Sequence, residues 1–310
     1  MISDNTINKK YFFQLILTFI ISTVFVYYAL KDFKLELFIN SIRESDFRFI
    51  FLSMIILIIV VHLRSIRWKF LINKNININI LYSAQLIGSM GNNILPFRFG
   101  EFLKSYYLEK KLGISKYEAF GSVILERVLD FLGLGFLFLI LIPSQVLYKL
   151  NNIYLIIVTL VIVISIIAFI LSLYLNNKND FINRKFSRII KEILSGFSNM
   201  IYSNLFYVLL LTILIWTSYL FVVYIMQKTF MLNLGINGSI LLLVISTIIL
   251  SVPSLPGNIG TFEGAVVYTL SLYGIEDSFG FGFILHSVSY IPYTLLGLIY
   301  FLRERKIILK

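Results

Sequence analysis

Long apolar runs are the feature of this sequence that most restricts its fold. Six stretches of about the length of a membrane span are rich in Ile, Leu, Val and Phe and carry few charges. A helix needs roughly 20 apolar residues to cross a bilayer, and in lipid it must pair its backbone groups internally. The sequence therefore predicts an all-α polytopic membrane protein. The predicted full spans are 11–30, 48–66, 131–148, 153–175, 205–227 and 280–302.

The composition agrees with this class of protein and excludes others. Of the 310 residues, 58% are hydrophobic and 14% are charged, whereas a soluble domain carries about 25% charged residues. The chain has no cysteine, which excludes disulfides, Cys–Zn sites and thiol nucleophiles. The net charge of +11 is typical of a membrane protein whose basic loops face anionic lipid, so we expect no nucleic-acid partner.

Two further apolar regions, 80–108 and 239–272, are interrupted by Gly and Pro. Lysine and arginine are frequent in the loops on both sides of the first region and sparse on both sides of the second. Basic loops stay in the cytoplasm, so the first region should start and end there and the second should start and end outside. Each region is therefore predicted to form a re-entrant helical hairpin. The same count predicts a protein of the cytoplasmic membrane with both termini in the cytoplasm.

The predicted order of elements occurs twice, as two spans, a hairpin and a third span. The segments ILPFRFGEF (94–102) and SLPGNIGTF (254–262) also share the pattern L-P-x-x-x-G with a Phe two residues later. Interrupted segments at matching places in two inverted halves are typical of transporter substrate sites. We therefore predict one domain, 1–310, with an inverted-topology repeat whose halves are 11–148 and 153–302.

The segment GNNILPFRFGE, residues 91–101, brings polar residues into the first interrupted region. Pro96 lacks an amide donor and Gly100 permits unusual backbone angles, so both predict a break in the helix. An arginine is suited to hold a phosphate through its planar fork of donors. The candidate substrate-binding residues here are Asn92, Asn93, Arg98 and Glu101. The alternative is a cytoplasmic loop in which the arginine and the glutamate are solvated.

The segment SVPSLPGNIGTFEG, residues 251–264, interrupts the second region. The predicted helix-breaking residues are Pro253, Pro256 and Gly260. Glu263 is the only charge in a long apolar stretch, and an ionisable residue at membrane depth is a functional candidate by default. Substrate contact and proton coupling both remain open for Glu263, and the alternative is a loop at the outer interface.

The segment ERVLD, Glu126 to Asp130, is the third charged constellation. A helix over 115–130 would place Ser122, Glu126 and Asp130 on one stripe, and Arg127 would be spaced to pair with Asp130. The functional hypothesis is that these charges line the same cavity as the hairpins. The alternative is an amphipathic helix at the cytoplasmic surface.

The segment HLRSIRW ends the second predicted span. Arg64 and Arg67 share a helix face, and Trp68 suits the level of the lipid headgroups. We predict an interfacial anchor here, and the alternative is a role in guiding lipid phosphates.

Enzyme signatures are absent from the sequence. It contains no H-E-x-x-H, G-x-S-x-G or P-loop pattern, and its longest hydrophilic stretch, 176–204, is too short for a cofactor domain. We therefore predict no catalytic residue, no metal and no cofactor.

Four segments in order carry a resemblance to a known family: RSIRW (64–68), GNNILPFRFGE followed by KSYYL (91–108), SKYEAFGSVILERVLD (115–130) and PSLPGNIGTFEG (253–264). The chain resembles the flippase-like transmembrane domain of lysylphosphatidylglycerol synthases, which also occurs as stand-alone membrane proteins. The resemblance implies a polytopic domain that moves lipids or lipid-linked compounds between leaflets, without the soluble aminoacyl-transfer domain of the synthase. By this resemblance, the candidate residues of both hairpins and of ERVLD fall in the most recognisable motifs of the family.

The resulting hypothesis is a translocase of phospholipids or polyprenyl-phosphate lipids. The two hairpins would shield a phosphate-bearing headgroup between them, because an unpaired phosphate is costly to bury in hydrocarbon. One alternative is an intramembrane transferase that uses carboxylates such as Glu101 and Glu126 as acid and base. The other is a non-transporting membrane partner of a glycosyltransferase or synthase.

Overall fold

The computed structural model describes residues 46–95, 98–176, 187–200, 202–251, 256–275 and 278–308, together with the single positions 27, 36, 39 and 43. In this part of the chain the secondary structure consists of helices and turns, without a strand. The predicted all-α class is therefore confirmed. The first predicted span, 11–30, lies outside the described residues apart from Tyr27, and so do Pro96 and Pro253.

Four helices of the described chain are long and apolar enough to cross a membrane. They are α3 (Phe47–Ile72), α7 (Asn152–Asn176), α10 (Leu205–Thr229) and α13 (Phe279–Ile308). Each coincides with a predicted span. Isoleucine and leucine side chains are exposed along α7, which suits a helix surrounded by lipid rather than water. The chain is thus a multi-pass membrane protein.

The charged segment after the first hairpin and the third predicted span form one helix, α6 (Lys116–Leu141). The predicted span 131–148 is therefore too long at its end, because a 3₁₀ turn, Gln145–Lys149, follows α6. Ser115 caps α6 by accepting the amide of Tyr117 at 3.3 Å. Because α6 starts well before its apolar part, it brings the charges of ERVLD into the middle of the bundle.

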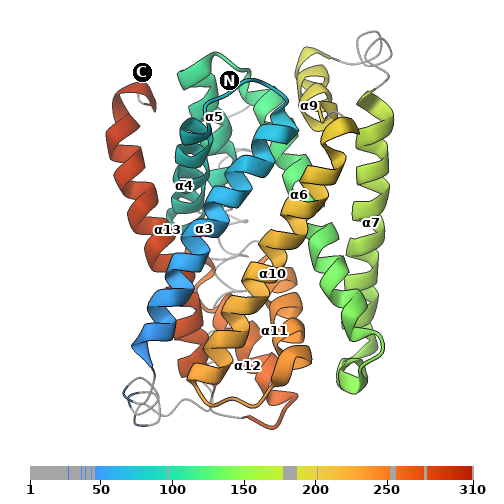
Figure 1. Cartoon of the computed structure of the whole chain (residues 1–310), viewed down its shortest axis with the longest axis vertical. Coiled ribbons are helices and arrows are strands. Elements are labelled where there is room, and N and C mark those ends of the chain that lie inside the picture. Colours follow the sequence, from blue (N-terminus) through green and yellow to red (C-terminus); the bar gives the residue numbers. More distant parts are fainter. Residues whose placement is uncertain are drawn as a thin grey trace, which may run out of the picture.

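Two pairs of shorter helices form the predicted hairpins. The first pair is α4 (Ile78–Ile94) and α5 (Gly100–Leu112), and the second is α11 (Gly235–Leu250) and α12 (Thr261–Ser271). At about 1.5 Å per residue the longest of the four measures about 25 Å, less than the roughly 30 Å of a bilayer core. Figure 1 shows α4 and α5 at the end of the molecule that carries the end of α13, and α11 and α12 at the opposite end.

The direction of the chain reverses between the two sets of elements. Figure 1 shows α3 rising toward the end that holds α4 and α5, whereas α10 descends toward the end that holds α11 and α12. The long helices that follow, α6 and α13, also run in opposite directions. This order agrees with the predicted inverted halves, whose first span lies outside the described residues and whose boundaries stay a prediction.

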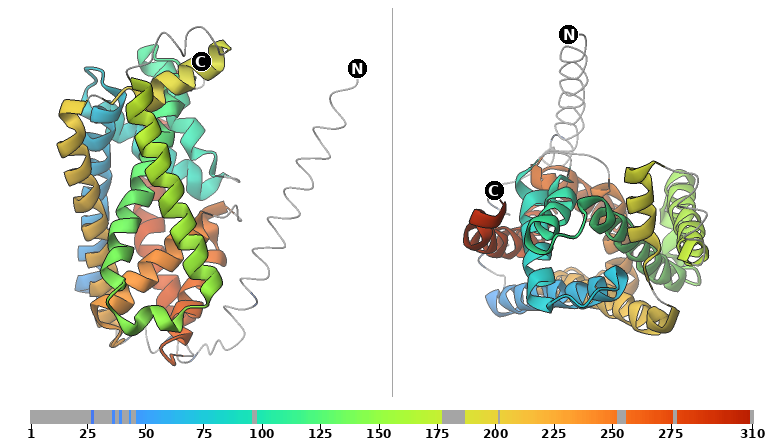
Figure 2. Two further views of the ribbon diagram at one scale, coloured as in Figure 1. Left: turned by 90° about the vertical axis from the view of Figure 1, so that its right-hand side faces the viewer. Right: turned by 90° about the horizontal axis from the view of Figure 1, so that it is seen from above.

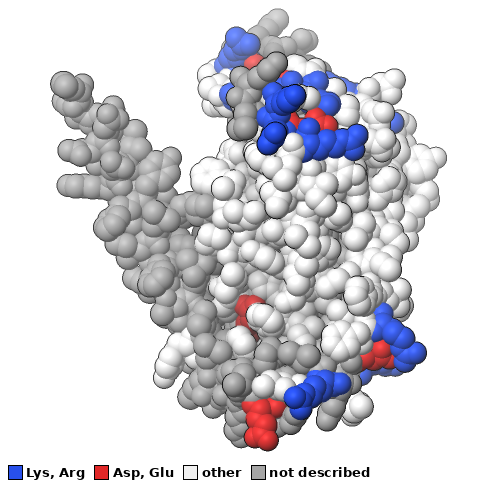
Figure 3. All heavy atoms as spheres, turned by 90° about the vertical axis from the view of Figure 1, so that its left-hand side faces the viewer, with Lys and Arg blue, Asp and Glu red and all other residues white. Residues whose placement is uncertain are grey.

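The remaining elements cover one side of this arrangement. The short helix α9 (Arg188–Ser198) packs against α6, and Figure 2 shows α7 and α9 on the opposite side of the bundle from α13. The two helices α6 and α9 touch through glycines, because a Cβ on Gly121 or Gly196 would overlap the backbone of the other helix. The face shown in Figure 3 has its charged side chains near the two ends and almost none on the broad band between them, as expected for a protein that sits in a bilayer.

Candidate functional site

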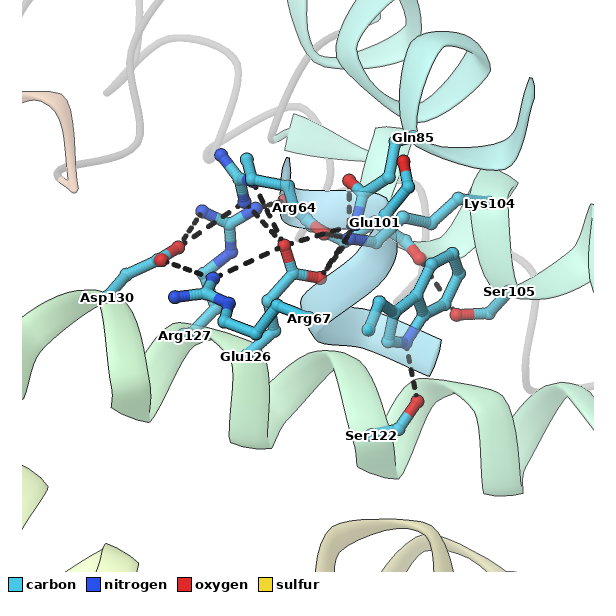
Figure 4. Close-up of polar contacts among 12 residues, drawn as sticks. Arg64, Arg67, Gln85, Glu101, Lys104, Ser105, Ser122, Glu126, Arg127 and Asp130 are labelled. Atoms are coloured by element: carbon cyan, nitrogen blue, oxygen red, sulfur yellow. Dashed lines mark hydrogen bonds and ion pairs between the residues drawn. The ribbon is translucent and has the colours of Figure 1, made fainter. Parts of the chain in front are cut away.

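Buried ion pairs connect α3, α5 and α6, and Glu126 lies at their centre (Figure 4). One oxygen of Glu126 accepts from Arg64 at 2.7 Å, and the other accepts from Lys104 at 2.8 Å. Gln85 of α4 adds a hydrogen bond of 3.1 Å to the same carboxylate. Glu126 is fully buried and the side chain of Lys104 is only 2% exposed. One carboxylate of α6 therefore joins side chains of α3, α4 and α5.

The two other carboxylates extend the network on either side of Glu126. Asp130 accepts from Arg67 at 2.6 Å and is paired with Arg64 and Arg127 at 3.3 and 3.2 Å. Glu101 of α5 is paired with Arg127, and with Lys104 at 3.1 Å. The predicted pairing of Arg127 with Asp130 is thus confirmed.

Four cations and three carboxylates make up this charged network, which comprises Arg64, Arg67, Glu101, Lys104, Glu126, Arg127 and Asp130. Every carboxylate in it contacts at least two cationic side chains. None of the three is therefore arranged as a metal ligand, and the described residues contain no group of three or more His, Cys, Asp or Glu side chains placed to hold a metal.

The predicted interfacial residues face the protein interior. Arg67 and Trp68 are fully buried, and the side chain of Arg64 is 17% exposed. The indole N–H of Trp68 donates to the hydroxyl of Ser122 at 2.9 Å, and the ammonium of Lys104 lies 4.8 Å from the centre of the Trp68 ring. These side chains therefore lie in or against the charged network inside the protein and do not face lipid headgroups at the surface.

Arg98 stands apart from the network. It lies between α4 and α5 with a positive φ of 55°, a backbone conformation that residues other than glycine seldom adopt. Its Nη1 donates to the main-chain oxygen of Leu250, at the end of α11, at 2.7 Å. Among the described residues no carboxylate forms an ion pair with Arg98. The positive charge of Arg98 is therefore available to a ligand in the cavity that this side chain lines.

The tips of the two hairpins meet inside the molecule. Asn93 of α4 donates to the hydroxyl of Thr294 at 2.8 Å and to the main-chain oxygen of Tyr290 at 3.3 Å, both on α13. At the other tip, a Cβ on Gly257 would lie 3.1 Å from the main-chain oxygen of Asn93. Gly257 has a positive φ of 70°, so the close approach and the turn both favour glycine here. Asn92 donates to Glu101 at 3.2 Å and so ties the two arms of the first hairpin together.

The second hairpin holds a carboxylate–imidazole pair. Glu263, in the first turn of α12, lies 2.7 Å from Nδ1 of His286 on α13. Its second oxygen accepts the amide of Gly260 at 2.7 Å, and Gly260 has a positive φ of 84°. The side chain of Glu263 is 5% exposed. Its side-chain partner in the described structure is thus a histidine, and it does not lie open to a substrate.

A cavity of about 310 Å³ lies where these parts meet. Both hairpins contribute to its wall, as do α3, α6, α10 and α13. The charged side chains that line it are Arg64, Arg98, Glu101, Lys104, Arg127 and Asp130. An aromatic group lines it as well, comprising Phe131, Trp216, Tyr219, Phe262, Tyr290 and Tyr293. Among the lining side chains, the buried donors Nε of Arg127 and Nε1 of Trp216 have no hydrogen-bond partner in the described structure. The wall is therefore basic overall and suited to an anion.

Sequence reasoning missed three members of this site. Lys104, Gln85 and His286 all take part in its hydrogen bonds. Lys104 follows Glu101 by three residues, a spacing that places both on one helix face. That spacing was the available signal for Lys104, whereas Gln85 and His286 stand alone in apolar sequence.

Comparison with known proteins covers nearly the whole chain. Residues 15–297 match the family described as "Lysylphosphatidylglycerol synthase TM region". The chain is also similar to archaeal proteins named UPF0104 membrane proteins. One from Methanocaldococcus jannaschii is 26% identical over 308 residues, with 90% of this chain and 92% of the relative covered. One from Pyrococcus horikoshii is 25% identical over 335 residues, with 97% and 98% covered.

No solved structure matches the chain. The family match includes α3, both hairpins, α6 and most of α13, and so contains every residue of the charged network. The chain belongs to the family of the lysylphosphatidylglycerol synthase transmembrane region.

Proposed function

We propose that this protein moves phosphate-bearing lipids, phospholipids or lipid-linked intermediates, between the leaflets of the cytoplasmic membrane. The headgroup would bind in the cavity between the two hairpins. The observation that carries the proposal is Arg98, a cation on the cavity wall whose guanidinium has no carboxylate partner among the described residues. A phosphate in hydrocarbon needs such a partner, because an unpaired buried charge is costly.

The charge balance around the cavity supports an anionic ligand. The charged network and Arg98 together supply five cations and three carboxylates. Arginine forks are the side chains best matched to phosphate oxygens, which accept two parallel hydrogen bonds from one guanidinium. A phosphate headgroup would offset part or all of the positive charge that the carboxylates leave, one unit for a phosphodiester and up to two for a phosphate monoester.

The size of the cavity supports a headgroup rather than a whole lipid. Its volume of about 310 Å³ is at the lower end of the roughly 300–1,000 Å³ usual for ligand sites. A headgroup fits such a space while the acyl or prenyl chains remain in the bilayer. The meeting of the hairpin tips places the cavity between the two ends of the molecule, where a substrate in transit would be shielded from lipid.

The orientation is part of the proposal. The loops rich in lysine and arginine adjoin the α4–α5 hairpin, and such loops stay in the cytoplasm. We therefore place this end in the cytoplasm, with the end of α13 beside it and the α11–α12 hairpin on the outer side.

An acid–base role for the carboxylates is not favoured. Glu101 and Glu126 are both engaged by two or more cations, so neither is placed as a general acid or base that would exchange protons with a substrate. A transferase would need a carboxylate that is free to do so.

The proposal is tested in phosphatidylcholine vesicles that contain the purified protein and a trace of fluorescent phosphatidylglycerol. The wild type should move the labelled lipid between leaflets faster than protein-free vesicles do. Arg98→Ala should slow this movement about tenfold or more, because a hydrogen bond to a charged group contributes about 1.5–3 kcal/mol. The matched control is Arg48→Ala, whose side chain is 89% exposed and, among the described residues, pairs with Asp46 alone. Equal rates in wild type and Arg98→Ala, or no movement above protein-free vesicles, would overturn the assignment.

A further inference from the structure

The pair formed by Glu263 and His286 is not part of the charged network, yet it lies beside the cavity. His286 lines the cavity wall, and its ring is stacked on Phe262 at 4.7 Å and meets Tyr290 edge-on at 5.6 Å. Its Nδ1 is occupied by Glu263, whereas its Nε2 has no protein partner within the described residues. A proton can therefore reach Nε2 from the cavity while the ring stays fixed.

The carboxylate of Glu263 has a partner at each of its oxygens. It occupies the first turn of α12 and accepts the amide of Gly260, and the amino end of a helix favours negative charge. Histidine is the side chain whose charge ordinarily changes in the physiological pH range. Both oxygens of Glu263 are engaged while Nε2 of His286 faces the cavity, so we assign the exchangeable proton of the pair to His286.

Among the described residues, this pair sets the charge on the side of the cavity formed by the second hairpin and α13. Within the described parts of α11, α12 and α13 that surround the cavity, no other acidic or basic side chain is present. With a neutral imidazole the pair has a charge of −1, and with an imidazolium it is neutral. The remaining charged or titratable side chains that face the cavity are Arg64 from α3, Arg98, Glu101 and Lys104 from the first hairpin, Arg127 and Asp130 from α6, Tyr219 from α10, and Tyr290 and Tyr293 from α13.

The two sides of the cavity therefore differ in how their net charge depends on proton binding. On the side of the first hairpin, the cations outnumber the carboxylates and attract an anionic headgroup. On the side of the second hairpin, the same headgroup approaches His286 with Glu263 behind it. The pair repels an anion unless His286 is protonated, and like charges repel strongly where little water screens them. Glu263 also accepts the amide of Gly260, where the helices of this hairpin are interrupted. Protonation of His286 therefore changes the electrostatic interaction of Glu263 at this interruption.

From this geometry we propose that the protein is a proton-coupled translocase, in which His286, paired with Glu263, carries one proton across with each anionic headgroup. The proton binds at Nε2 from the compartment that the headgroup leaves and is released to the compartment that it reaches. No covalent bond changes. This inference rests on the proposed function and adds its energy source.

The test uses the same vesicles and labelled phosphatidylglycerol, with a gradient of one pH unit across the membrane and the membrane potential clamped at zero. One proton per headgroup predicts that the labelled lipid accumulates about tenfold in the leaflet that faces the alkaline compartment, because one pH unit is a tenfold difference in proton activity. A pH-sensitive dye inside the vesicles should report protons moving with the lipid. Protein-free vesicles give the baseline.

Two variants assign the effect to the pair. His286→Gln keeps a polar side chain that cannot be protonated, so the lipid should distribute evenly between leaflets under the same gradient. The matched control is His62→Gln, the other histidine of the chain, which is exposed on α3 and should keep the tenfold accumulation. Retention of a defined melting temperature in detergent shows that each variant is folded.

The outcomes separate the two proposals. If the wild type moves the lipid but distributes it evenly under the gradient, proton coupling is overturned and translocation stands. If His286→Gln accumulates the lipid as the wild type does, the role of His286 is overturned. If the wild type moves no lipid above protein-free vesicles, both proposals fall.

Discussion

Nη1 of Arg98 and the main-chain oxygen of Leu250 lie 2.7 Å apart, so the tip of one hairpin holds the end of the first helix of the other. The last carbonyl groups of a helix lack partners within the helix and carry its negative end, and a cation is a favourable partner for them. A headgroup phosphate would compete with Leu250 for the same guanidinium. Substrate binding would then loosen the contact that joins the two hairpins.

The first prediction concerns the centre of the charged network. Glu126→Gln leaves the buried side chains of Arg64 and Lys104 without their shared carboxylate, and the loss of one partner from a buried ion pair costs about 3–5 kcal/mol. We expect a large fall in the melting temperature of the detergent-solubilised protein. Glu118→Gln is the control, because the pair of Glu118 with Lys74 is partly exposed and such pairs contribute at most about 1 kcal/mol.

A double variant checks the physical cause. Lys104→Met combined with Glu126→Gln removes one of the two stranded cations, so its loss of stability should be smaller than the sum of the two single losses. If Glu126→Gln and Glu118→Gln melted at the same temperature, the network would not be the structural centre described here.

The second prediction concerns the close approach of α4 and α5. A Cβ on Gly100 would overlap the main-chain oxygen of Gly88, and no side-chain rotation can relieve a contact between backbones. Gly100→Ala should therefore separate the arms of the hairpin and slow lipid movement at least tenfold. Gly113→Ala has open space around it and a positive φ of 69°, so it should incur only a backbone strain of about 1–2 kcal/mol and keep its activity. Equal activity of the two variants would argue against the described packing.

The third prediction concerns orientation. Because the chain has no cysteine, single cysteines can be introduced without background labelling. Asn75→Cys, exposed between α3 and α4, should be protected from a membrane-impermeant thiol reagent in intact cells, and Ser271→Cys, exposed at the end of α12, should be labelled. The reverse pattern would invert the proposed topology.

Much of the fold was predictable because periodic and compositional signals are strong in a membrane protein. The spans that became α3, α7, α10 and α13 follow from apolar length alone, and the two hairpins follow from loop charge combined with interrupting Gly and Pro. The end of α6 at Leu141 could not be predicted from the sequence, because the apolar sequence continues past this residue.

The partners within the site were not predictable to the same degree. An arginine near the end of a span gives the same sequence signal whether it faces headgroups or protein, so Arg67 was assigned to the interface although it is fully buried and paired with Asp130. Glu263 was recognised as a lone charge, but its partner His286 lies 23 residues away on another helix. Only packing reveals such pairs.

The most direct test of the central claim is mass spectrometry of the intact, gently purified protein with its bound lipids. The wild type should retain a phosphate-bearing lipid, and Arg98→Gln should retain at least tenfold less of it, whereas Arg48→Gln should equal the wild type. Equal retention by wild type and Arg98→Gln, or a wild type that carries no phosphate-bearing lipid, would contradict the proposal that the cavity between the hairpins binds a phosphate headgroup.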